Sequence, residues 1–61
     1  MTDERSQLKK RIVEGETRLA KQRDLVGVLA RDGSDTSAAI ILLGAIESGQ
    51  AIRLRRLAAL A

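Results

Sequence analysis

The chain has 61 residues, enough for a single domain over residues 1–61 and close to the smallest size at which a monomeric fold is stable without cross-links or metal. It contains no Cys and no His, which excludes disulfides and the commonest metal sites. Hydrophobic residues make up 44% of it and aromatic residues none, and the formal net charge is +3. This composition favours helices, and it disfavours recognition of single-stranded nucleic acid, which depends on aromatic stacking.

Mostly apolar residues recur at alternating steps of four and three through the first half of the chain. Charged residues lie between these positions, as in an amphipathic helix, and Glu14 and Arg18 have the order that favours an ion pair one turn apart. The spacing predicts a first helix over residues 3–32 with one seam. The seam positions are Leu8, Ile12, Gly15, Leu19, Gln22, Val26 and Leu29.

Both ends of this helix carry sequence signals. Thr2 is the expected N-cap, because its hydroxyl can accept a hydrogen bond from a free backbone N–H group of the first turn. Gly33 is expected to end the helix in the left-handed conformation, which glycine adopts at little cost. Ser34 or Asp35 then caps the next helix.

A second helix is expected over residues 36–60. Its side facing the first helix is expected to contain Ala39, Leu43, Ile46, Leu57 and Leu60. The first half of this helix is apolar on every side, so one neighbouring helix of the same size cannot cover it. A second helical surface must therefore cover Ile40, Ile41 or both. The additional apolar residues are Ala38, Ile40, Ile41, Leu42, Ala45 and Ile52.

Two helices of similar length joined by a short turn predict an all-α antiparallel hairpin. Pairing of two hairpins gives a four-helix bundle in which both seams share one core. The first expected partner is thus the chain itself, as a homodimer, and the second is another protein. The expected oligomer interface contains Leu19, Val26, Leu29, Ile40, Leu43, Gly44 and Ile46.

The apolar segment also bears on membrane insertion. The longest uninterrupted apolar stretch, from Ala38 to Ile46, is shorter than the roughly 20 residues that a membrane-spanning helix needs. The N-terminal residues are polar and acidic, and no apolar core of a secretory signal follows them. We therefore expect a cytoplasmic protein without a membrane span. Association of the amphipathic helices with a membrane surface is a further alternative.

Glycines at positions 15, 27, 44 and 49 fall inside the expected helices, where each costs about 1 kcal/mol relative to Ala. Close helix approach would offset this cost, and Gly44 is the strongest candidate for such a contact. A tolerated weakness and a ligand site are the alternatives. Gln22 lies at a seam position, either buried, where it fixes the register, or at the bundle edge with its amide in water.

A hairpin brings the start of its first helix beside the end of its second. Six basic residues then share one end of the molecule, where they contact phosphate groups of nucleic acid or dock an acidic partner. Alternatively, they complement a helix C-terminus and keep this end soluble, since nearby acidic residues offset the charge. The six are Lys9, Lys10, Arg11, Arg53, Arg55 and Arg56.

Catalytic chemistry has few candidate groups in this sequence. No His or Cys is available as base or nucleophile, and two helices offer no deep pocket. Glu14 and Glu16 are two residues apart and point to different sides of a helix, which makes a poor acid and base pair. We expect no enzymatic activity and no cofactor.

Residues on both sides of the turn resemble a known pattern. The matching positions are Glu14, Gly15, Glu16, Arg18, Ala20, Gln22, Arg23, Leu25, Val26, Leu29, Gly33, Asp35, Thr36, Ala39, Leu42, Leu43 and Glu47. The pattern resembles short uncharacterised helical-hairpin proteins of alphaproteobacteria, over about half the chain. In that family His often stands where this chain has Arg11 and Ser34, and an aromatic residue often precedes the acidic residue matched by Glu47. The resemblance implies a bacterial hairpin and carries no activity.

These observations lead to a functional expectation. The chain is expected to be a non-enzymatic protein-interaction or regulatory module that acts as a homo-oligomeric helical bundle. The alternative is binding of RNA or DNA through the basic end.

Overall fold

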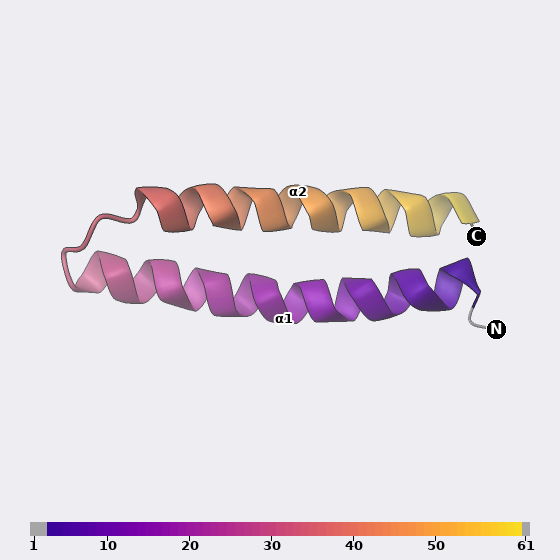
Figure 1. The fold of residues 1–61 in the computed structure, drawn as a ribbon, viewed down its shortest axis with the longest axis horizontal. Coiled ribbons are helices and arrows are strands. Elements are labelled where there is room, and N and C mark those ends of the chain that lie inside the picture. Colours follow the sequence, from indigo (N-terminus) through magenta and orange to yellow (C-terminus); the bar gives the residue numbers. More distant parts are fainter. Residues whose placement is uncertain (1–2, 61) are drawn as a thin grey trace.

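The computed structural model describes residues 3–60 and consists of two antiparallel α-helices joined by a short turn (Figure 1). Helix α1 spans Glu4–Arg31 and helix α2 spans Ser37–Leu60. No strand occurs in these residues. The expected all-α hairpin is therefore confirmed, and each helix boundary lies within one residue of its expected position.

Helix α1 begins at a cap different from the one expected. The carboxylate of Asp3 accepts a hydrogen bond of 2.7 Å from the Ser6 N–H group, so Asp3 is the N-cap. Thr2, the expected cap, lies outside the described residues. Hydrogen bonds from Ser6, first of all from its backbone, lower the pKa of Asp3. A carboxylate suits this position, because it also meets the positive end of the helix dipole.

The turn is built from backbone hydrogen bonds around Gly33, as predicted. Gly33 has a φ of 72°, which is the left-handed conformation. The Ser34 N–H group donates to the Leu29 carbonyl at 2.9 Å, and the Gly33 N–H group donates to the Ala30 carbonyl at 3.2 Å. This pair of bonds is a Schellman motif, which satisfies carbonyls at the end of α1.

Asp35 then prepares the start of α2. Its carboxylate accepts a hydrogen bond of 2.9 Å from the Ser37 N–H group, and hydrogen bonding from Ser37 lowers the pKa of Asp35. Of the two residues expected to cap this helix, Asp35 is thus the one whose side chain does so. The chain reverses direction between Arg31 and Ser37, which places the two helices side by side.

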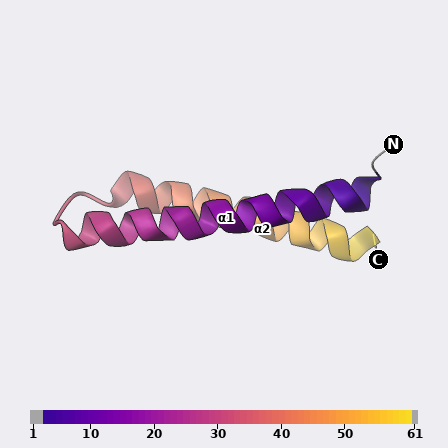
Figure 2. The same cartoon turned by 90° about the horizontal axis from the view of Figure 1, so that it is seen from below.

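The hairpin is a rod with very little core. Its extents are 47 × 16 × 14 Å and its radius of gyration is 14.3 Å, whereas a compact chain of this length has about 10 Å. Figure 2 shows that the helices cross along the rod. Only Leu8, Ile12 and Ala39 are buried apolar residues among those described. Two helices that meet along one seam leave most of their surface uncovered.

Candidate interaction surface

Helix α1 meets α2 along the seam that its sequence predicts. Each of the seven seam positions from residue 8 to residue 29 is buried or half-buried. Leu8 and Ile12 are the most covered apolar side chains, and they lie at the open end of the hairpin, which we define as residues 3–12 and 50–60. The alternating spacing therefore identified the inward side of α1 correctly.

The corresponding side of α2 is more polar than expected. Its expected residues Ala39, Leu43, Ile46 and Leu57 are buried or half-buried. Leu60, also expected there, is exposed, whereas Gln50 is buried and Arg53 half-buried. The last two continue the same steps of three and four. A search for apolar residues alone does not find them.

Two buried glutamines connect the helices. The Gln22 side-chain amide donates to the Ala39 carbonyl at 2.9 Å, and the Gln50 amide donates to the Ile12 carbonyl at 2.6 Å. No buried side-chain nitrogen or oxygen atom in the described part of the chain lacks a partner. Of the two alternatives for Gln22, the buried one is therefore correct. The two bonds lie at different levels of the rod, so they oppose sliding of one helix along the other.

One glycine is required by this arrangement. A Cβ atom on Gly15 would lie 2.9 Å from the Gln50 Cδ atom, too close for an ordinary contact. Gly15 thus leaves the space in which the Gln50 amide reaches Ile12. A Cβ on Gly44 or Gly27 would meet no atom within 4 Å, so the close contact expected at Gly44 is not made within the hairpin.

The main feature of the surface is the set of large apolar side chains of α2 that α1 leaves exposed. We call it the outer surface of α2, and its large residues are Ile40, Ile41, Leu42, Ile52 and Leu54. Ile41 is 75% exposed and Ile52 is 62% exposed. Large apolar side chains exposed together on one helix are typical of a surface that contacts a partner or a membrane.

Helix α1 has a different outward side. Its exposed large apolar residues are Val13, Leu25 and Val28, and they lie among charged residues on successive turns. Such a side is adequately solvated. Most of the exposed apolar surface of the hairpin therefore belongs to α2.

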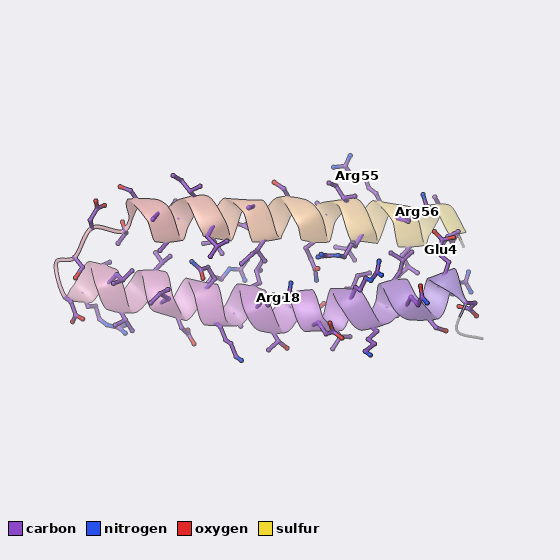
Figure 3. The ribbon with its side chains drawn as sticks, viewed as in Figure 1. Glu4, Arg18, Arg55 and Arg56 are labelled. Atoms are coloured by element: carbon purple, nitrogen blue, oxygen red, sulfur yellow. The ribbon has the colours of Figure 1, made fainter. Side chains whose placement is uncertain are left out.

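The open end gathers the basic residues expected there. Arg56 forms an ion pair with Glu4, and the Arg5 guanidinium donates to the Leu60 carbonyl at 3.0 Å. Figure 3 shows Arg56 directed toward Glu4 and Arg55 directed away from α1. Lys9 and Lys10 are exposed.

Two shallow cavities lie along the groove between the helices. One, of about 350 Å³, is lined at the open end by residues that include Arg11, Arg53 and Arg56. The other, of about 200 Å³, is lined by small residues such as Gly15 and Gly49, together with Arg18 and Arg53. Glu4, paired with Arg56, also lines the first cavity, but basic residues outnumber acidic ones in both linings, so an anionic group is the ligand that their charge favours.

The charged groups form no metal site in the part of the chain that the structure describes, where no cluster of three acidic residues occurs. The ion pair considered for Glu14 and Arg18 is not formed, and Arg56 with Glu4 is the single ion pair of residues 3–60.

The residues expected in an oligomer interface fall into two groups. Those half-buried between α1 and α2 are Leu19, Val26, Leu29, Leu43 and Ile46. Ile40 and Gly44 are exposed on α2. The first group contributes to the hairpin itself, and the exposed part of α2 also includes Ile41 and Ile52.

The expectation that the chain has no segment fit to span a membrane is wrong. Helix α2, Ser37–Leu60, has 24 residues and is long and apolar enough to cross a bilayer, and 11% of its most apolar window is buried in the hairpin. Its length of about 36 Å exceeds the roughly 30 Å of a bilayer core. The error lay in counting only uninterrupted apolar residues, because a spanning helix also tolerates residues such as Ser48 and Gly49.

Comparison with protein-family models, with curated proteins and with solved structures finds no match for this chain. The resemblance to alphaproteobacterial helical hairpins stays a prediction.

Proposed function

We propose that the chain is a non-enzymatic protein-interaction module in which two hairpins pair into a four-helix bundle through the apolar side chains that α1 leaves exposed on α2. The single observation that carries this proposal is the exposure of α2, whose apolar residues lie uncovered along its length. Water is a poor environment for this surface. A second copy offers the same kind of surface in return.

The energetics support association. Each large aliphatic side chain that becomes fully buried contributes about 1.5–3 kcal/mol. The isolated hairpin gains this contribution from few residues, because only Leu8, Ile12 and Ala39 are buried apolar residues among residues 3–60. A chain of this size has a small margin of stability, and Cys and His are absent from it. Covering Ile41 and Ile52 against a partner would add the missing apolar burial.

A membrane span by α2 would require the hairpin to open. Helix α1 carries charged residues on successive turns and cannot enter a bilayer core. A spanning α2 would therefore have to leave α1, which breaks the bond from Gln22 to the Ala39 carbonyl and places Gln50 in lipid without its partner. Pairing of intact hairpins keeps both bonds.

Sedimentation equilibrium at micromolar concentration tests the proposal. We expect a species with twice the chain mass of 6.6 kDa, and a helical circular dichroism spectrum. A folded helical species of single-chain mass would contradict the proposal. Flotation with liposomes tests binding to a membrane. If the chain is recovered with the lipid and forms no dimer in water, the outer surface of α2 contacts a membrane.

A second candidate function has its own observation. The open end carries seven Arg and Lys side chains against two acidic ones. Three of the arginines, Arg11, Arg53 and Arg56, line one cavity. We propose duplex RNA or DNA as the alternative ligand, because phosphate groups match this charge and the absence of aromatic residues disfavours single strands.

A salt titration of binding tests this candidate. Retention on duplex nucleic acid that weakens steeply with salt would support it, because contacts with phosphate release counterions. Lack of retention at low ionic strength would contradict it. An Arg53→Gln and Arg56→Gln double variant should reduce the salt slope, and a Lys21→Gln variant in the middle of α1 is the matched control.

A further inference from the structure

The charge of the hairpin changes steadily along its length. The open end, residues 3–12 and 50–60, carries seven basic and two acidic side chains, a formal net charge of +5. The middle, residues 13–23 and 40–49, has three of each and is neutral. The turn end, residues 24–39, has Arg31 against Asp24, Asp32 and Asp35, a net charge of −2.

The two glutamine hydrogen bonds lie near the borders between these three regions. The bond from Gln50 to the Ile12 carbonyl joins the two helices at the border of the open end, and the bond from Gln22 to the Ala39 carbonyl joins them near the border of the turn end. The rod is 47 Å long, several times the Debye length of about 8 Å at physiological salt. Its two ends therefore act as separate electrostatic regions.

Two hairpins can lie side by side in two ways. If the turns lie at the same end, both open ends meet, and Arg53, Arg55 and Arg56 on each α2 lie beside those of the other copy at a helix separation of about 8–10 Å. If the turns lie at opposite ends, each open end meets the −2 turn end of the other copy. The charges of the two copies are then roughly one Debye length apart, so they repel each other in the first arrangement and attract each other in the second.

The apolar residues permit the second arrangement. The outer surface of α2 extends over both halves of the helix, with Ile40, Ile41 and Leu42 near the turn and Ile52 and Leu54 near the open end. In an antiparallel pair, the first group of each copy lies against the second group of the other. Apolar contact can thus form near both ends of the pair, and charge decides the direction.

We infer that the partner covering α2 is a second copy in antiparallel orientation, with the turn of each hairpin beside the open end of the other. This inference rests on the proposed four-helix bundle and adds its direction. The complementary charge of the two ends is the observation that selects a second copy in this orientation.

Cross-linking of single-cysteine variants tests the direction, because the natural chain has no Cys. Ser34→Cys places a thiol in the turn and Ser6→Cys places one at the open end, both at exposed positions. The variants are treated with a short bismaleimide, separately and after mixing and refolding together. Thr17→Cys, exposed on the outward side of α1, is the control variant.

We expect the mixture of Ser6→Cys and Ser34→Cys to give a mixed dimer in about tenfold or greater excess over the cross-linked Ser34→Cys homodimer. A dominant Ser34→Cys homodimer would overturn the antiparallel direction and leave the bundle standing. Absence of every cross-link, together with a single-chain mass in sedimentation, would overturn the bundle and the inference with it. Salt should weaken the antiparallel pair, whereas it would strengthen a parallel one.

Discussion

The two helices of this hairpin differ on the sides that they turn away from each other. Helix α1 exposes charged residues with few apolar ones among them, and helix α2 exposes Ile40, Ile41, Leu42, Ile52 and Leu54. The inward sides, in contrast, are alike, since each contributes apolar residues and one buried glutamine. The seam explains why the hairpin forms. The outer surface of α2 explains why a hairpin alone is an incomplete structure.

The largest expected effect comes from placing charge on the outer surface of α2. Ile41→Lys combined with Ile52→Lys should raise the dimer dissociation constant by about 100-fold or more, because each buried isoleucine contributes about 1.5–3 kcal/mol. Sedimentation equilibrium measures this constant. Val13→Lys on α1 is the matched control, since Val13 is 61% exposed in the hairpin. An equal effect of the control would remove the distinction between the two helices.

The second effect concerns the contact inside the seam. Gly15→Ala forces the Gln50 amide away from the Ile12 carbonyl and should lower the free energy of unfolding by about 1 kcal/mol, because overpacking costs about 1–3 kcal/mol and Ala recovers about 1. Gly27→Ala meets no atom within 4 Å and should raise this free energy by about 0.5–1 kcal/mol. Urea unfolding at one protein concentration measures both. Changes of the same sign would contradict the close approach at Gly15.

The third effect is a looser register between the two helices, with little change in the free energy of unfolding. Gln22→Leu keeps the side-chain volume and loses one hydrogen bond of about 0.5–1.5 kcal/mol, partly offset by the burial of an apolar side chain. We expect a free energy of unfolding within about 1 kcal/mol of the natural chain, and faster amide exchange on α2 near Ala39 because the helices can slide. Unchanged exchange would show that Gln22 does not hold the register.

The smallest effect is the response of the caps to acid. The pKa values of Asp3 and Asp35 are lowered in the folded chain, so their contribution to stability is present above the ordinary carboxyl pKa of about 3.9 and is lost as the pH falls below it. Asp35→Asn keeps a capping side chain without the titration. The difference in unfolding midpoint between pH 7 and pH 3 should therefore be smaller in this variant. An equal difference would exclude a contribution from Asp35.

Much of the fold could be predicted from the sequence, because side chains on one side of a helix recur every three or four residues. Steps of three and four identified the inward side of α1 from Leu8 to Leu29, and the left-handed turn at Gly33 followed from the glycine itself. The inward side of α2 was only partly predicted, since Gln50 and Arg53 give no apolar signal. Gln22 was recognised as a seam residue, but its partner required the structure.

The surface was harder to predict for two physical reasons. Apolar residues on every side of a helix show that more than one neighbour is needed, but they do not identify the side left uncovered. The hairpin itself half-buries expected interface residues such as Val26 and Leu43, and it leaves exposed Ile41 and Ile52, which the sequence places among the apolar residues outside the inward side of α2. The prediction that no helix could span a membrane was wrong for a separate reason. A helix can span a bilayer if its length and its average hydropathy are sufficient, and an unbroken run of apolar residues is not required.

Small-angle X-ray scattering tests the pairing of the outer surfaces of α2 most directly, because it measures mass and shape together. Two hairpins packed side by side should scatter with twice the chain mass of 6.6 kDa and keep a longest dimension close to the 47 Å of one hairpin. A particle of single-chain mass, or a pair whose longest dimension is about double that of one hairpin, would contradict the account.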